Sequence, residues 1–330
     1  SDIEDAQRRD FTINGLFLDP ETDSVVDYVG GAQDLKAGII RAIGDARARF
    51  TEDKLRMLRA VRFACRFAFN IEDSTLAAMV EMAPGIMQVS GERVGTELVK
   101  MLTGPARGRA LSLLAESGLL QHVLPECAAF IGVQGPGGDQ FGRACAMLDL
   151  MDPQAISLTV AWACVLHAHH AAHRLDGQGA APGVLAIETP LRRLRQPVEV
   201  MNAVCVALEN VAVVKDAQSM GVATLKRLLR QPQISAILEL ERLLATTEGR
   251  PPAAWRFCHA KLEEWKTREG VDPLRPSIPL DGRALQSLGI KPGPLFSQLL
   301  FALETEVLEN RCTTREEAES FVLRLASGQQ

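Results

Sequence analysis

The stretch FTEDKLRMLRAVRFACRFAF, from Phe50 to Phe69, decides the fold class of this chain. Thr51 is a typical N-cap residue and two acidic residues follow it, so the pattern predicts a helix that begins there and continues without a break. At 100° per residue, apolar and polar positions separate onto opposite sides. The apolar side holds Leu58, Val61 and Cys65, and the polar side holds Asp53, Arg56, Arg59, Arg62 and Arg66.

The polar side of this predicted helix is almost purely arginine, whereas an ordinary solvated face mixes signs and favours lysine and glutamate. Arginine is suited to phosphate groups and to base edges. Asp53 and Arg56 are three residues apart, which places their side chains next to each other on one helical face. Such a pair offers an acceptor beside donors, the pattern that cytosine and adenine match and uracil and guanine do not. An ordinary helix salt bridge has the same spacing, so the residues alone leave both interpretations open.

The chain on the two sides of this stretch differs in periodicity. Residues 11 to 44 alternate and turn as β structure does, and predict three short strands at 11–18, 25–28 and 38–43, with a break at Gly30 and Gly31. So small a sheet needs more strands or a covering helix. We therefore expect that the sequence begins partway through a domain whose first half precedes Ser1.

From about Ala46 the apolar spacing of three and four predicts a run of helices. Glycine-rich and proline-rich segments at 132–138 and 176–190 are predicted to be connecting loops, because neither contains the Gly-Lys-Ser/Thr of a phosphate-binding loop. Residues 313–316 are predicted to form a capping box ahead of the last helix, and residues 290–294 to separate two others.

Composition limits the class of protein. The chain has 330 residues, 47% of them hydrophobic, which is enough for buried cores, and its net charge of −5 means that a nucleic-acid role must rest on a local basic surface. Seven scattered cysteines without a C-x-x-C pair favour a reducing compartment. We expect a cytoplasmic protein with no membrane partner, since the longest apolar run is too short to span a bilayer and no signal peptide is recognisable.

Three segments, in this order, resemble motifs B, C and D of the class II tRNA nucleotidyltransferases and bacterial poly(A) polymerases. They are RRDFTING (Arg8 to Gly15), DYVGGAQDLKAGIIRAIG (Asp27 to Gly44) and EDKLRMLRAVRF (Glu52 to Phe63). The similarity continues less sharply through residues 91–126, which resemble the neck helices of the family, and returns at 280–300 in its tail. Tyr28 and Val29 stand where relatives commonly have a proline and an aromatic residue.

The resemblance implies a role for each matching residue. Arg8 and Arg9 would neutralise nucleotide phosphate, Asp10 would accept a hydrogen bond from a ribose hydroxyl, and Asn14 would support that corner. Asp53 and Arg56 would bind the base edge of CTP or ATP. Glu52 would orient Arg56, while Arg59 and Arg62 are candidates for phosphate contacts.

Motif A of the family, a glycine-rich V-R-D segment and a D-x-D pair, has no counterpart in this sequence. In the family those aspartates hold two Mg²⁺ ions that activate the RNA 3′-hydroxyl and stabilise the leaving pyrophosphate. We therefore assign no catalytic or metal-binding residue to this chain and expect it to be inactive without that segment, although the full-length protein would use Mg²⁺.

The later part of the chain carries weaker signals. His169 and His173 have a spacing that can bind metal, but Ala168 stands where relatives with a His-Asp phosphohydrolase region have an aspartate, so this region is interpreted as degenerate. Residues 191–196 and 225–230 form basic helical faces that fit either an RNA backbone or plain solvation.

Together these observations predict an α+β, mostly α fold. Residues 1–45 would be the C-terminal part of a nucleotidyltransferase head with a short antiparallel β remnant, 46–126 a helical neck, and 127–330 a helical, RNA-binding body and tail. The predicted function is template-independent transfer from CTP or ATP to the 3′ end of tRNA. Poly(A) addition to another RNA and a noncatalytic RNA-binding protein derived from the family are the alternatives.

Overall fold

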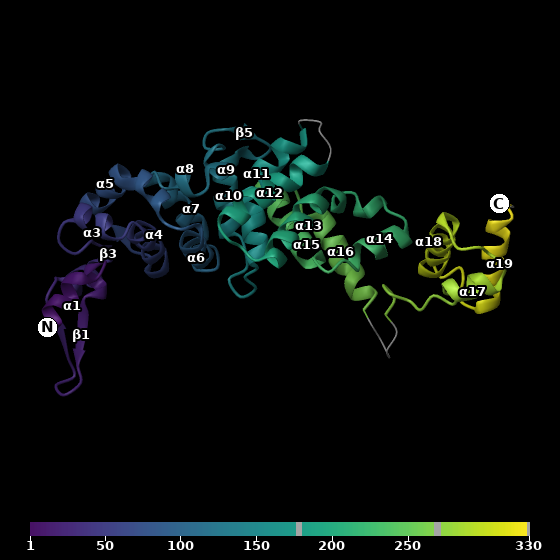
Figure 1. The fold of residues 1–330 in the computed structure, drawn as a ribbon, viewed down its shortest axis with the longest axis horizontal. Coiled ribbons are helices and arrows are strands. Elements are labelled where there is room, and N and C mark those ends of the chain that lie inside the picture. Colours follow the sequence, from purple (N-terminus) through teal and green to yellow (C-terminus); the bar gives the residue numbers. More distant parts are fainter. Residues whose placement is uncertain (176–179, 267–271, 329–330) are drawn as a thin grey trace. The chain divides into compact units, whose positions relative to one another are not determined.

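The computed structural model, drawn as a ribbon in Figure 1, describes residues 1–175, 180–266 and 272–328. The chain forms two compact units. The first unit contains Ser1–Asn210 and Arg242–Pro251, and the second contains Val211–Glu241 and Pro252–Gln330. Helices dominate both units, and the strands are few and short, which confirms the predicted α+β, mostly α fold class. Within the described residues, no helix combines the length and apolarity needed to cross a bilayer.

The N-terminal segment is more helical than its alternating pattern predicts. Its elements are α1 (Asp2–Arg8), the 3₁₀ helix η1 (Thr12–Asn14), β1 (Leu16–Asp19), β2 (Ser24–Asp27), α2 (Gly31–Ala37) and β3 (Ile39–Ile40). The predicted strand at 11–18 is therefore wrong over its first half. The predicted break at Gly30 and Gly31 is the start of α2, because the Asp27 carboxylate accepts hydrogen bonds from four successive backbone N–H groups there, at 2.9 to 3.0 Å.

The predicted three-stranded sheet is also wrong. β1 and β2 form an antiparallel hairpin, which projects from the N-terminal end of the first unit in Figure 1. β3 pairs instead in parallel with β4 (Asn70–Ile71), a partner that lies beyond two helices in the sequence. An isolated antiparallel bridge between Phe11 and Ala42 ties the N-terminal segment to the residues after β3. Local alternation cannot reveal such a pairing, because the partner is remote in sequence.

The stretch at 50–69 is divided between two helices rather than one. α3 (Ala46–Glu52) begins at the N-cap Asp45, and α4 (Leu55–Phe67) follows after extended backbone at Asp53. The predicted N-cap Thr51 is inside α3, where its hydroxyl donates to the Arg47 carbonyl oxygen at 2.8 Å. The Asp53 carboxylate accepts from the Leu55 N–H at 3.1 Å, so this residue ends one helix and starts the next.

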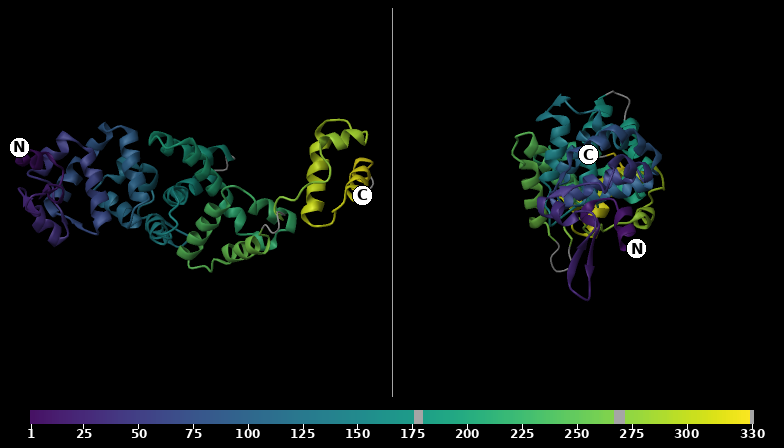
Figure 2. Two further views of the ribbon diagram at one scale, coloured as in Figure 1. Left: turned by 90° about the horizontal axis from the view of Figure 1, so that it is seen from below. Right: turned by 90° about the vertical axis from the view of Figure 1, so that its left-hand side faces the viewer.

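The remaining elements of the first unit are mostly helices that follow one another along the chain, and Figure 2 shows them in blue and teal. They are α5 (Asp73–Met82), η2 (Ala83–Gln88), α6 (Gly91–Leu102), α7 (Arg107–Glu116), α8 (Leu120–Val123), α9 (Pro125–Ala128), β5 (Gln134–Gly135), β6 (Gly138–Asp139), α10 (Gln140–Asp149), α11 (Leu158–Leu175) and α12 (Ala180–Arg193). The run of helices predicted from Ala46 is confirmed, except that β4 and the small β5–β6 hairpin interrupt it.

The predicted loop at 176–190 is wrong from Ala180 onward, where α12 begins; residues 176–179 lie outside the described residues. Pro182 falls in the first turn of α12, where a missing N–H costs nothing. Pro190 sits inside the helix and gives up one hydrogen bond of the helix. The division between the two units falls in α13 (Val198–Val214) and α15 (Ile234–Thr247).

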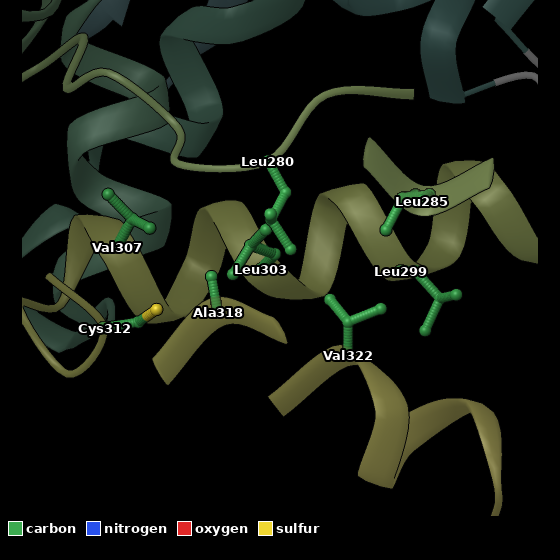
Figure 3. Close-up of a cluster of buried hydrophobic side chains, with 8 residues drawn as sticks. All are labelled: Leu280, Leu285, Leu299, Leu303, Val307, Cys312, Ala318 and Val322. Carbon is green, nitrogen blue, oxygen red and sulfur yellow. The ribbon is translucent and has the colours of Figure 1, made fainter. Parts of the chain in front are cut away.

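The second unit ends in a helical tail with its own core. The second unit contains η3 (Ala217–Ser219), α14 (Val222–Leu229), α16 (Ala253–Glu264), α17 (Gly282–Ser287), α18 (Pro294–Leu308) and α19 (Arg315–Ala326). Figure 3 shows the apolar side chains that α17, α18 and α19 direct toward one another. The capping box of α19 is formed by Thr314 and Glu317, one residue later than predicted, and α18 begins at Pro294 as the break at 290–294 predicts.

Candidate nucleotide-binding site

A hollow of about 720 Å³ lies where the end of α1, the start of α4 and the start of α6 meet, and we call it the N-terminal hollow. Its lining is polar and mostly charged: Asp5, Arg8, Arg9, Asp10, Asn14, Asp53, Leu55, Arg56, Arg59, Phe63 and Arg93. The structure thus brings together seven of the nine residues that the resemblance assigns to nucleotide binding. Glu52 and Arg62 do not line it.

Asp10 is the buried centre of this lining. One carboxylate oxygen accepts from the Phe11 N–H at 3.1 Å and from the Asn14 amide at 2.7 Å, and the other accepts from Arg59 Nε at 2.6 Å. Only 7% of Asp10 is exposed. Asp10 therefore fastens η1 to α4, and Asn14 supports this corner through its amide.

The two adjacent arginines behave differently. Arg8 is the last residue of α1, and its side chain is 78% exposed, with a loose ion pair to Asp5 at 3.7 Å. Arg9 is held by Asp5 at 2.8 Å and by the Asn14 carbonyl oxygen at 2.8 Å, and its guanidinium lies over the Phe17 ring. Arg8 is consequently the freer of the two to reach a ligand in the hollow.

Asp53 and Arg56 meet in the hollow by a geometry other than the one predicted. They do not share a helical face, because Asp53 precedes α4, and the backbone N–H of Arg56 donates to the Asp53 carbonyl oxygen at 3.1 Å. The Asp53 carboxylate accepts from Arg93 at 2.8 Å. Burial opposes its ionisation, but the hydrogen bonds from Arg93 and from the Leu55 N–H outweigh burial and lower the pKa of Asp53.

The Arg56 guanidinium makes three hydrogen bonds within the protein and still has N–H groups from which no atom of the described residues accepts. It donates to the Glu52 carboxylate at 2.6 Å and to the carbonyl oxygens of Arg49 and Arg8 at 3.1 and 3.0 Å. Three of about five guanidinium N–H groups are thus engaged, which leaves about two. The hydrogen bond from Arg56 lowers the pKa of Glu52. That Glu52 orients Arg56 toward a ligand stays a prediction.

Arg59 and Arg62 are separated by the structure. Arg59 lines the N-terminal hollow, bound to Asp10. Arg62 donates to the buried Glu97 of α6 at 2.6 Å and lines another hollow of about 270 Å³ at the far end of α4, together with Arg66 and Lys100. Arg62 therefore joins α4 to α6 and does not share the hollow of Arg8 and Asp10.

Sequence reasoning assigned no role to Arg93, which lies in the segment resembling the neck and is 40 residues from Asp53. The available signal was a basic residue in the first turn of an amphipathic helix, and that signal does not identify a partner. Phe63 is a second lining residue without a predicted role, and the guanidinium groups of Arg59 and Arg62 lie over its ring at 5.4 and 4.1 Å.

The residues present do not fit a two-metal centre. Within the described ranges, no group of three or more His, Cys, Asp or Glu side chains is placed to hold a metal ion. The carboxylates that line the hollow, Asp5, Asp10 and Asp53, each accept from an arginine. At the histidine pair, His173 Nδ1 contacts the His169 carbonyl oxygen at 2.8 Å.

Two family models match the chain. The model described as the poly(A) polymerase head domain matches residues 1–41, and the model described as the probable RNA and SrmB-binding site of polymerase A matches residues 68–131. The first match includes Arg8, Asp10 and Asn14, and the second includes Arg93.

Individual relatives match nearly all of the chain. A CCA-adding enzyme of Leuconostoc mesenteroides is 30% identical over 306 residues, which are 92% of this chain and 67% of that enzyme. The crystal structure of the Bacillus stearothermophilus CCA-adding enzyme in complex with CTP has a TM-score of 0.72 and 26% identity, over 100% of this chain and 75% of its own. The Thermotoga maritima CCA-adding enzyme complexed with tRNA matches in fold, with a TM-score of 0.62 and 21% identity, over 98% of this chain and 74% of its own. From the identity and coverage of these relatives, and from the site that the matching motifs build, the chain belongs to the class II CCA-adding enzyme family.

Proposed function

We propose that this chain supplies the nucleotide-recognition and RNA-binding parts of a tRNA nucleotidyltransferase that adds all or part of the CCA end. The observation that carries the proposal is the convergence of Arg8, Asp10, Asp53 and Arg56 on one hollow. In the reaction, the RNA 3′-hydroxyl releases its proton as its oxygen attacks the α-phosphorus of CTP or ATP. The bond between that phosphorus and the oxygen bridging to the β-phosphate breaks, and pyrophosphate leaves.

The base would be bound by the hydrogen-bonding groups that Asp53 and Arg56 have left. The Asp53 carboxylate accepts two hydrogen bonds from the protein and, with about four lone-pair sites, can accept another from an exocyclic amino group. Arg56 can donate to the adjacent ring nitrogen. Cytosine and adenine present this order of groups, and the order in uracil and guanine would leave like groups facing each other.

The phosphates would be bound by the exposed Arg8, whose fork of donors suits phosphate oxygens. Arg59 is a second cation at the hollow, partly compensated by Asp10. The metal-binding aspartates of the family belong to motif A, which these 330 residues do not contain. We expect the chain alone to bind nucleotide and RNA, whereas transfer and its Mg²⁺ requirement need motif A.

Equilibrium binding of CTP, ATP, UTP and GTP to the 330-residue chain tests the proposal. We expect CTP and ATP to bind at least about tenfold more tightly than UTP and GTP, which is about 1.4 kcal/mol of discrimination. Arg56→Ala should abolish this preference while the affinity for a tRNA acceptor-stem hairpin stays within about twofold. Arg66→Ala, an arginine of the same helix outside the hollow, is the matched control and should change neither property. Equal affinity for all four nucleotides would refute base recognition at this site.

Poly(A) addition is the second candidate, favoured by the two polymerase A family models. The residues of the N-terminal hollow accept cytosine and adenine alike. Single labelled nucleotides offered to the protein with motif A present, on tRNA lacking its 3′ end and on unstructured RNA, separate the two. Incorporation of CMP into tRNA supports CCA addition, and AMP alone on both RNAs supports poly(A) addition.

A further inference from the structure

The end of α12 holds an arginine where the backbone favours glycine. The N–H of Arg195 donates to the Arg192 carbonyl oxygen at 3.0 Å and the N–H of Gln196 to that of Leu191 at 2.9 Å, which is the Schellman pattern of a helix terminus. Arg195 occupies the left-handed position of this motif, with a φ of 53°. A side chain at such a φ crowds the backbone, so glycine would form the same turn with less strain.

The Arg195 side chain has no partner within the described part of the chain, and it is exposed. Its neighbours are engaged: Arg193 forms a two-pronged ion pair with Glu126 at 2.7 and 2.8 Å, and Arg192 pairs with Glu188 at 3.0 Å. The Arg192 side chain is itself 70% exposed, so its ion pair is open to competition by another anion. Arg195 therefore places an uncompensated positive charge at this helix end.

These arginines line a hollow of about 540 Å³, which we call the α12 hollow. Its lining is Leu185, Glu188, Thr189, Arg192, Arg193 and Arg195. A guanidinium group and a threonine hydroxyl are donors that suit phosphate oxygens. The lining offers no aromatic face on which a base could stack, so a backbone phosphate is the part of a nucleic acid that fits it.

Helix α6 lies directly against the end of α12, and its Arg93 also lines the N-terminal hollow. A β-carbon at Gly91 would overlap the Arg193 carbonyl oxygen, and one at Gly95 would overlap that of Leu194. Arg93 lies about 200° around α6 from both glycines, on the side that reaches Asp53. Helix α6 therefore contacts the backbone of Arg193 and Leu194 on one side and contributes Arg93 to the N-terminal hollow on the other.

We propose that Arg195, assisted by Arg192 and Thr189, binds a backbone phosphate of the RNA whose 3′ end enters the N-terminal hollow. The proposal rests on the proposed function, and it assigns to the α12 hollow a sequence-independent contact. Such a contact releases counterions and gives binding a dependence on salt.

Arg195→Gly tests the proposal because it should move stability and RNA binding in opposite directions. Relief of the left-handed strain should raise the melting temperature by about 2–4 °C. Loss of one phosphate contact should weaken the affinity for a tRNA acceptor-stem hairpin lacking its CCA end by about three- to tenfold in 0.1 M salt. The slope of log K against log salt concentration should become shallower by about 0.7 to 0.9.

Two further variants of the 330-residue chain complete the design. Ala68→Gly changes another exposed left-handed residue, with a φ of 57°, and should raise the melting temperature without changing RNA affinity or its salt slope. Arg195→Lys keeps the charge and should retain the wild-type salt slope. If Arg195→Gly binds the hairpin as wild type does, the contact at Arg195 is refuted while the proposed function stands. If the wild-type chain does not bind the hairpin, the RNA-binding part of the proposed function is refuted together with this inference.

Discussion

Arg59 of α4 and Asp10, which are 49 positions apart in the sequence, form an ion pair of 2.6 Å at the N-terminal hollow. Asp10 is buried, and Arg59 is its cationic partner. This pair fixes the segment that carries Arg8 and Arg9 against the helix that carries Arg56. The relative position of the phosphate-binding and base-binding groups therefore depends on it.

The first prediction concerns this pair. In a double-mutant cycle with Asp10→Asn and Arg59→Gln, chemical unfolding should give a coupling free energy of about 1–3 kcal/mol, because removing one partner leaves the other uncompensated. The same cycle on Arg47 and Glu81, an ion pair whose two side chains are 58% and 57% exposed, should give a clearly smaller coupling free energy, because solvent screens the pair. Similar coupling free energies in both cycles would show that the burial of Asp10 does not strengthen its ion pair with Arg59.

The second prediction concerns Arg8. Because its side chain is exposed and only loosely paired, Arg8→Ala should leave unfolding within about 0.5 kcal/mol of wild type. It should weaken CTP binding by about five- to tenfold and reduce the difference between CTP and cytidine, which has no phosphate. Isothermal titration with both ligands measures this. An unchanged affinity for CTP would remove Arg8 from the phosphate site.

The third prediction concerns Arg93, whose hydrogen bond to the Asp53 carboxylate helps to lower the pKa of Asp53. The ionised carboxylate of Asp53 is a stronger acceptor for the amino group of a base than the protonated carboxyl group, so CTP binding should weaken as pH falls through the lowered pKa of Asp53. In Arg93→Ala this loss should begin at a higher pH, because the hydrogen bond that lowers the pKa is gone. Titration of CTP affinity between pH 3 and pH 7 checks the shift, and Arg93→Lys should lie between the two. Identical pH profiles would mean that Asp53 does not contact the base.

The fourth prediction concerns Glu72, the N-cap of α5. Burial opposes its ionisation, but hydrogen bonds from Ser74 and Thr75 outweigh burial and lower the pKa of Glu72 to about 2. Its contribution to stability is present above its ordinary pKa near 4.5 and is lost as pH falls toward 2. Glu72→Gln should therefore destabilise the chain by about 2–3 kcal/mol at pH 7 and by much less at pH 2. Urea unfolding of the wild-type chain and of Glu72→Gln between pH 2 and pH 7 measures the difference in unfolding free energy. The same difference at every pH would contradict the prediction.

The fifth prediction concerns Gly31, where α2 touches η1. A β-carbon at this position would overlap the Thr12 carbonyl oxygen, and α2 would have to move away from the segment that carries Asp10. Gly31→Ala should cost about 1–3 kcal/mol of unfolding free energy and weaken CTP binding. Gly221→Ala is the control, since its β-carbon would meet only Glu309 at 3.9 Å, an ordinary contact. Equal stability of the two variants would show that the contact with Thr12 yields easily.

The sequence by itself determined the helical class of the chain and predicted most of the residues that line the N-terminal hollow. Apolar spacing at Leu58, Val61 and Cys65 correctly predicted the buried side of α4, because amphipathic periodicity is a local property that tertiary contacts rarely reverse. Arg8, Asp10, Asp53 and Arg56 were identifiable because their chemical types and spacing follow the family motifs, which do not depend on how the helices end.

Only the tertiary structure decided how those residues meet. The extended backbone at Asp53 breaks the local helical pattern. Remote segments are joined by the pairing of β3 with β4 and by the contacts of Arg93 with Asp53 and of Arg62 with Glu97. Hydrogen bonds between residues some forty positions apart leave no periodic trace in the sequence. The break at Asp53 arises because its carboxylate competes for the Leu55 N–H, a choice that helix propensity alone does not settle.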